Sequence, residues 1–178
     1  MARLFIALDI APASKQYIAK CAELIHHQGM RVIPSANYHL TLFFLGEVEL
    51  DAQAILIGEI SNRLATKPIS SFNYQLAHLG LFNKPKVAYL GLKHIPAPLS
   101  QLANIINEVV AKLGFVNQHN RFIPHISIFR KAKALPSDVV LRSVLPCQVT
   151  ATSFSLYHSV STASGVQYQA IHTWALNN

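Results

Sequence analysis

The spacing of apolar residues along the chain predicts strands and helices in turn. Apolar residues at period two are typical of strands, and apolar residues three or four positions apart are typical of amphipathic helices. Three helices are expected, and they begin at Pro12, Asp51 and Leu99. The strands are expected at residues 1–8, 38–46, 72–82, 86–92, 125–129, 147–159 and 166–176.

The predicted elements fall into two similar halves. Each half contains one strand with a histidine inside an apolar run, His39 in the first half and His125 in the second. We interpret this as a weak internal duplication of two small α+β lobes, each presenting one histidine-containing strand. No linker composition separates the halves, so we expect a single domain over residues 1–178.

Composition and length indicate a folded chain. Of the 178 residues, 51% are hydrophobic and 13% are charged, which suits a well-packed core and argues against disorder. No apolar run approaches the roughly 20 residues of a membrane-spanning helix, and Asp9 and Pro12 break the apolar start too early for a signal peptide. The two cysteines, Cys21 and Cys147, are expected to be reduced and buried. These features predict a cytoplasmic protein with no membrane partner.

The charge balance favours anionic partners. The chain has 15 Lys and Arg against 8 Asp and Glu, a net charge of +7. Such an excess attracts phosphates without giving specificity. No dense run of Lys or Arg occurs, so a disordered basic tail is not expected.

The first candidate for chemistry lies in YHLTLFFLGE, residues 38–47. Strict alternation along a strand puts His39, Thr41 and Phe43 on one face. A single histidine in an apolar strand is more often a structural residue than a catalyst. The interpretation therefore depends on whether the pattern recurs.

The pattern recurs in RFIPHISIFRK, residues 121–131, where His125, Ser127 and Phe129 share a face. Two imidazoles and two hydroxyls that converge would suit general acid–base chemistry on a phosphodiester. One imidazole can accept a proton while the other donates, and each hydroxyl can donate a hydrogen bond to an anionic oxygen. The residues alone leave open which histidine is the acid and which is the base.

Other chemistries find less support in the sequence. The acidic residues form no pair of the kind used in carboxylate catalysis, and no glycine-rich phosphate-binding loop or nucleophile motif occurs. Two alternatives stay open. One is a metal site built on the two histidines, for which neither motif supplies a third ligand. The other is an RNA-binding module without catalysis, whose exposed aromatic and basic alternation is less evident here.

The paired segments HLTL and HISI resemble the doubled H-x-T/S-x motifs of the 2H phosphoesterase superfamily. More of the chain is similar to one branch, the RNA 2′,3′-cyclic phosphodiesterases, also called 2′-5′ RNA ligases of the LigT type. The similarity extends over essentially the whole chain, through the segments RLFIALDI, NYHLTLFFLGEV, RFIPHISIFR and LYHSVSTASGVQYQAIHTWAL.

The resemblance implies an α+β fold with two pseudo-symmetric lobes of antiparallel sheet, helices packed outside and a central cleft lined by both motifs. It implies hydrolysis of 2′,3′-cyclic phosphate ends of RNA, or of nucleoside cyclic phosphates, to 2′-phosphates, with no metal or other cofactor. In this scheme His39 is the proton donor and His125 the proton acceptor. Thr41 and Ser127 hold the non-bridging oxygens.

Further details follow from the same resemblance. Arg130 resembles a basic residue that binds phosphate beside the cleft, although strict alternation would send it to the face opposite His125 unless the strand bulges. Phe43 is a candidate for stacking on a base. Ile123 and Tyr89 stand where the family often has a polar residue and a Trp. We expect a monomer. Within the superfamily the substrate could instead be a small cyclic nucleotide, a 2′-5′ oligonucleotide or a cyclic ADP-ribose phosphate.

Overall fold

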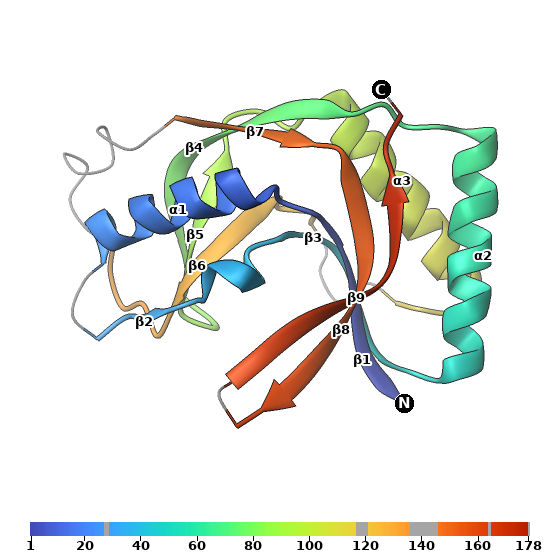
Figure 1. The fold of residues 1–178 in the computed structure, drawn as a ribbon, viewed down its shortest axis with the longest axis horizontal. Helices are drawn as coiled ribbons and strands as arrows, with labels where there is room; N and C mark the ends of the chain where they lie inside the picture. The colour runs from blue at the N-terminus through green and yellow to red at the C-terminus, as the bar shows by residue number, and fades with distance from the viewer. Residues whose placement is uncertain (27–28, 117–120, 136–145, 164, 178) are drawn as a thin grey trace.

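The computed structural model describes residues 1–26, 29–116, 121–135, 146–163 and 165–177. In these residues three α-helices and a short 3-10 helix accompany one antiparallel sheet (Figure 1). The helices are α1 (Pro12–Ile25), α2 (Leu50–Thr66), α3 (Ala97–Lys112) and the 3-10 helix η1 (Ser35–Asn37). The strands are β1 (Ala2–Leu8), β2 (Arg31–Val32), β3 (Leu40–Val48), β4 (Phe72–Phe82), β5 (Val87–Leu92), β6 (His125–Arg130), β7 (Cys147–Ala151), β8 (Ser153–Thr162) and β9 (Gly165–Ala175). The predicted α+β class is confirmed.

The sheet divides into two halves of four strands. Its strand order is β7-β4-β5-β6-β3-β1-β8-β9, and β2 adds to β6. The strands β7, β4, β5 and β6 form one lobe, and β3, β1, β8 and β9 form the other. β3 and β6 join the lobes through one registered pair, Leu40 opposite Ile126. In each lobe the strand at the junction and its neighbour are connected through a helix, as β1–α1–β3 or β5–α3–β6, so the duplicated, bilobal organisation is confirmed.

The two faces of the sheet differ in character around this pair. Leu40 and Ile126 are both 0% exposed and point into the core. Because successive side chains of a strand alternate, the residues on either side of them point to the opposite face. We call this the histidine face, because it carries His39 and His125.

The helices pack against the other face, where the core lies. Directly after α1 the ring of His26 lies 5.7 Å from that of Phe129 on β6. On α2 the Oγ of Ser61 accepts a hydrogen bond of 2.9 Å from Nε1 of Trp174 on β9. α3 ends where Gly114 adopts a positive φ of 84°, a conformation that glycine adopts without steric cost. The helices therefore do not cover the histidine face.

The segment 147–159 was expected to be one strand, and this prediction is wrong. The chain forms β7, which pairs with β4 in one lobe, and β8, which pairs with β1 in the other. The buried apolar residues change parity at the break, from odd positions up to Ala151 to the even positions of Phe154 and Leu156. The chain thus crosses between lobes at Thr152. Residues 130–146 were assigned to no predicted element, and 136–145 of them lie outside the described residues.

A β-bulge follows the motif in each lobe. Ile6 pairs with Phe43 and Ala7 with Thr41, so β3 has one extra residue at this point. As a result Phe43 is turned into the core, 4% exposed, and Phe44 is 55% exposed with its ring 6.0 Å from Phe5. The expectation that Phe43 shares the face of His39 is therefore wrong, because strict alternation fails at the bulge.

The second bulge has the same form in β6. Ala88 pairs with Phe129 and Tyr89 with Ser127, which leaves one extra residue in β6. Phe129 is 0% exposed in the core, and Arg130 is exposed. The bulge places Arg130 on the same face of the sheet as Ser127. The sequence predicted this placement only if the strand contained a bulge.

The first bulge predicts opposite outcomes for two adjacent phenylalanines. Phe43→Ala should lower the free energy of unfolding by about 3–5 kcal/mol, because it empties a buried site. Phe44→Ala should lower it by less than about 1 kcal/mol, because the side chain is largely in water. Chemical denaturation of both variants measures the difference. Equal losses, or a larger loss at Phe44, would show that the strand does not bulge there.

Candidate active site

The four polar residues of the two motifs meet where the lobes join. The antiparallel register through Leu40 and Ile126 puts His39 across from Ser127 and Thr41 across from His125. Directly opposed residues on one face have Cβ atoms about 4.5–5.5 Å apart. Each imidazole is thus paired with the hydroxyl of the other motif. Neither hydroxyl makes a side-chain hydrogen bond within the described part of the chain, so both are available to a ligand.

The two imidazoles are held in the same way. Nδ1–H of His39 donates to the carbonyl oxygen of Asn37 at 2.7 Å, and Nδ1–H of His125 donates to that of Ile123 at 2.7 Å. A carbonyl only accepts, so each bond assigns the proton of the neutral ring to Nδ1. Nε2 is then the proton-accepting nitrogen of each neutral ring.

Aromatic rings flank both histidines. The ring of His39 lies 4.8 Å from Phe5 and 5.0 Å from Tyr168. Around His125 the rings of Phe82 and Tyr89 lie at 4.9 and 5.1 Å. These contacts restrict each imidazole and exclude water from one side of it. The sequence singled out only Tyr89, because ring contacts between distant strands depend on register.

Burial lowers the pKa of His39 from 6.5 to about 4. Desolvation is the main cause, and the positive charges of His125, Lys15 and Arg130 add to it, whereas the carbonyl of Asn37 opposes it. These contributions also show that His125 and Arg130 lie within electrostatic reach of His39. An anion bound among these groups would reverse the repulsion and raise the pKa of His39.

The carboxylate of Asp9 holds side chains of the strand beside His39, and the sequence did not single out this residue. Its carboxylate accepts hydrogen bonds from the hydroxyls of Tyr157 at 2.6 Å, Ser153 at 2.6 Å and Ser155 at 2.9 Å. The ring of Tyr157 stacks on Phe5 at 5.2 Å, and Phe5 in turn contacts His39. The sequence did contain a sign of this arrangement. Phe5 and Asp9 are an even number of residues apart, so an extended chain places both side chains on one face.

A third histidine lies on the same face. In the register of β4, β5 and β6, His78 is opposite Gly91, and Gly91 is opposite His125. The ring of His78 covers Gly91 so closely that a Cβ there would lie 2.2 Å from its Nε2. Glycine at this position lets the ring lean toward His125. The sequence did not single out His78, because the residue two positions further on is Gly80 and carries no hydroxyl.

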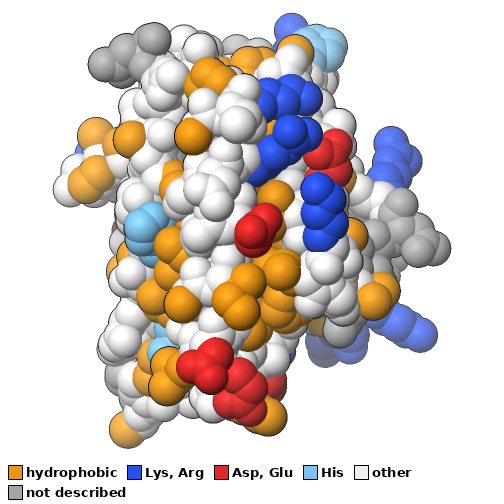
Figure 2. Space-filling model, turned by 90° about the vertical axis from the view of Figure 1, so that its right-hand side faces the viewer, with side chains coloured by type: hydrophobic (Ala, Val, Ile, Leu, Met, Phe, Trp, Pro, Cys, Tyr) orange, Lys and Arg blue, Asp and Glu red, His pale blue; other side chains and the backbone are white. Residues whose placement is uncertain are grey.

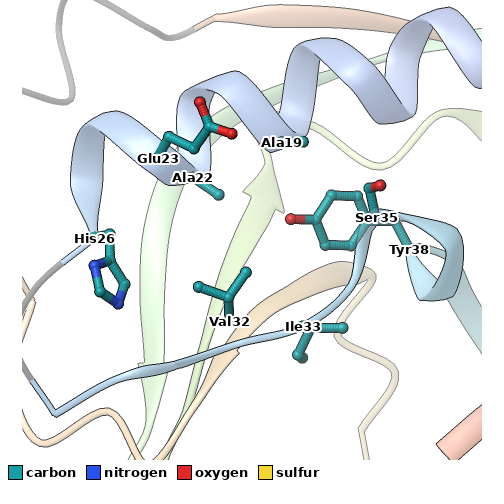
Figure 3. Close-up of a pocket in the computed structure, with 8 residues that line it drawn as sticks. All are labelled: Ala19, Ala22, Glu23, His26, Val32, Ile33, Ser35 and Tyr38. Carbon is teal, nitrogen blue, oxygen red and sulfur yellow. The ribbon is translucent and has the colours of Figure 1, made fainter. Parts of the chain in front are cut away.

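A separate pocket of about 380 Å³ lies outside this site (Figure 3). It is formed between α1 and the segment that leads from β2 to η1, and its lining includes Glu23, His26 and Tyr38. Burial and the nearby charge of Glu23 raise the pKa of Tyr38 to about 12. Because Tyr38 precedes His39, its burial holds the segment that presents the imidazole on the other side.

The described residues contain no group of three or more His, Cys, Asp or Glu side chains that could hold a metal ion. Among them there is also no helix long and apolar enough to cross a membrane. Both cysteines are buried and form no disulfide with a described residue, as expected.

Comparison with known proteins agrees with this geometry. The sequence model of the 2′-5′ RNA ligase superfamily matches residues 13–162. The chain belongs to the 2′-5′ RNA ligase superfamily. It is 30% identical to the RNA 2′,3′-cyclic phosphodiesterase of Escherichia coli (strain K12), over 98% of this chain and 96% of that one. It is also 30% identical to the RNA 2′,3′-cyclic phosphodiesterase of Methanocaldococcus jannaschii, over 97% and 99% of the two chains.

Solved structures of this superfamily have the same fold. The crystal structure of E. coli LigT complexed with 3′-AMP is 27% identical with a TM-score of 0.84, over 99% of both chains. A crystal structure described as a phosphoesterase is 27% identical with a TM-score of 0.85, over the whole of both chains. The predicted family and the predicted bilobal fold are therefore confirmed.

The burial of His39 predicts its titration. In the unliganded protein the His39 ring should titrate near pH 4, because desolvation and three nearby positive groups disfavour the imidazolium. Saturating inorganic phosphate should raise that midpoint, because the anion favours the charged ring. NMR of ring-labelled histidine measures both values.

Protein stability provides a second readout of the same pKa difference. Between pH 6.5 and about 4 the unfolded chain binds a proton at this position that the folded chain does not. The free energy of unfolding should therefore fall as the pH falls through this range, and His39→Gln should remove part of the fall. A His39 midpoint near 6.5 without phosphate would contradict the burial argument.

Proposed function

We propose that the protein hydrolyses RNA 2′,3′-cyclic phosphate ends to 2′-phosphates by two-histidine acid–base catalysis. The observation that carries the proposal is the symmetric placement of His39 and His125, each held through Nδ1 and each opposite the hydroxyl of the other motif. The names of the relatives at 30% identity support the substrate. The superfamily description adds reversible 2′-5′ ligation as an activity to test.

The mechanism follows from the four groups. Neutral His125 takes a proton from water through Nε2 as the water oxygen attacks phosphorus. The bond from phosphorus to the 3′ oxygen breaks, and protonated His39 gives its proton to that oxygen. The phosphate remains on the 2′ oxygen. Thr41 and Ser127 donate hydrogen bonds to the non-bridging oxygens, where negative charge increases in the transition state.

The lowered pKa of His39 constrains this assignment. A ring with a pKa of about 4 is neutral at pH 7, so the acid must acquire its proton when the substrate binds. The cyclic phosphate brings one negative charge among His125, Arg130 and Lys15, and this charge favours protonation of His39. The reversed roles, with His39 as base and His125 as acid, are the second candidate, and the same lowered pKa favours them.

Several features complete the proposal. The chain works as one domain without a cofactor, in the cytoplasm and as a monomer. Arg130 contributes positive charge to the phosphate site, as its effect on His39 indicates. Phe43 has no part in it, because it is buried in the core. A small cyclic nucleotide or a 2′-5′ oligonucleotide is the alternative substrate class.

The decisive assay uses a nucleoside 2′,3′-cyclic phosphate in the presence of a chelator. His39→Ala and His125→Ala should each lower kcat by about 10²-fold or more, because each removes a proton-transfer group. The double variant should be only slightly worse than the poorer single one. Thr41→Ala and Ser127→Ala should cost less, since proton transfer stays intact.

His94→Ala is the matched control, because this exposed histidine lies in the turn before α3. It should leave kcat unchanged. The product should carry its phosphate on the 2′ oxygen. Near-native turnover of His39→Ala would refute the two-histidine mechanism, and loss of activity in chelator that zinc restores would favour a metal site.

The pH–rate profile separates the two assignments of acid and base. The profile of kcat should be bell-shaped, with an alkaline limb from loss of the acid and an acidic limb from protonation of the base. If His39 is the acid, a His39 variant with residual activity loses the alkaline limb. Loss of the acidic limb instead would establish the reversed roles.

A further inference from the structure

The charges of the molecule are unevenly distributed. Five of the eight acidic residues lie on α2, on α3 or at the end of β3 beside α2: Glu47, Glu49, Asp51, Glu59 and Glu108. Figure 2, which faces the side where α2 lies, shows acidic side chains among basic and apolar ones. The other three acidic residues are Asp9, Glu23 and Asp138, so basic residues outside this region have few acidic neighbours in the sequence.

Six exposed cations gather in three short segments, which are β2, the turn between β4 and β5, and the end of β6. We call this group the basic end. No Asp or Glu occurs in residues 29–37, 83–87 or 125–135. The members of the basic end are Arg31, Lys84, Lys86, Arg130, Lys131 and Lys133.

Backbone pairing brings these segments together. Arg31 of β2 is directly opposite Arg130 of β6, and Val87 of β5 is opposite Arg130 on its other side. The amide of Ala132 donates to the carbonyl of Lys86 at 3.1 Å, which joins the turn to the end of β6. Lys86 and Lys131 both have positive φ, 64° and 59°, a conformation that non-glycine residues adopt at a cost in energy.

The two arginines at the centre are an unfavourable pair by themselves. Like charges directly opposite on one face of a sheet destabilise it. Neither guanidinium makes a hydrogen bond or an ion pair with the described residues, whose two ion pairs are Met1–Glu49 and Arg63–Glu108. A bound anion would compensate this repulsion, and arginine binds phosphate through two parallel hydrogen bonds.

The basic end adjoins the catalytic groups. Ser127 and Arg130 are three residues apart on one strand, at most about 10 Å at about 3.3 Å per residue. The charge of Arg130 already acts on His39. Arg31 extends the positive surface away from the histidines, and its guanidinium lies 3.8 Å from the position of a Cβ on Gly165, at the β8–β9 turn.

We propose that the basic end is a second anion-binding site, which holds the phosphodiester backbone of the RNA upstream of its cyclic phosphate. The proposal rests on the proposed function for the position of the RNA end. It makes the preferred substrate an RNA chain rather than a mononucleotide. Arg31 is the residue that distinguishes an RNA substrate from a mononucleotide, because it lies beyond the groups that act on the cyclic phosphate.

The test compares Arg31→Ala on two substrates. On a nucleoside 2′,3′-cyclic phosphate its kcat/KM should stay within about twofold of wild type. On a short RNA oligonucleotide with the same cyclic end, kcat/KM should fall by about tenfold through KM, because a phosphate contact is lost. The slope of log(kcat/KM) against log salt, over about 50–200 mM, should decrease by about one.

Lys112→Ala removes one positive charge at the C-terminal end of α3 and is the matched control. It should change neither the salt slope nor the preference for RNA. Thermal unfolding should show that both variants remain folded, since both side chains are exposed. Equal loss on the two substrates would assign Arg31 to the catalytic phosphate, and no loss on either would remove it from RNA binding; both outcomes overturn the proposal.

A binding measurement keeps the two proposals separable. Fluorescence anisotropy with a labelled RNA oligonucleotide ending in a 2′-phosphate needs no turnover. If wild type hydrolyses neither substrate but binds this RNA more tightly than Arg31→Ala does, the proposed function fails and the basic end stands. If polyglutamate displaces the RNA as effectively as unlabelled RNA does, the site binds any polyanion and the assignment to RNA fails.

Discussion

The active-site geometry depends on one backbone pairing, Leu40 opposite Ile126. This pair joins the two lobes and fixes the register between the strands that carry the motifs. Both side chains are buried, so the hydrophobic effect opposes any slip of one residue, which would turn the histidine of the slipped strand into the core. Two imidazoles and two hydroxyls are thereby brought together by apolar side chains on the other face of the sheet.

The bulges after each motif give the symmetric site its asymmetry. Both lobes contain the same β-bulge, in which one extra residue turns a phenylalanine into the core and exposes the residue after it. In the first lobe that residue is Phe44, and in the second it is Arg130. The same backbone geometry thus delivers an aromatic surface on one side of the histidines and a positive charge on the other.

Local periodicity was enough to predict the helices, the β4–β5 hairpin and the doubled motif, because these depend on neighbours in sequence. Strict alternation failed for Phe43, since a bulge depends on the partner strand. The break at Thr152 did leave a signal, a change of parity in the apolar pattern. The pairing of Arg31 with Arg130 and the rings around His39 depend on register between distant segments, which the sequence does not contain locally.

Identical hydrogen bonds at Nδ1 mean that the motifs themselves cannot decide which histidine gives the proton. The difference must come from the surroundings. His39 is half-buried against Phe5 and Tyr168, and the positive charges of Lys15 and Arg130 act on it. These groups disfavour the imidazolium until an anion arrives, so the phosphate that reacts also sets the protonation of the ring. In the proposed mechanism, substrate binding and acid strength are then coupled, because desolvation and the nearby cations disfavour a proton on His39 until the phosphate binds.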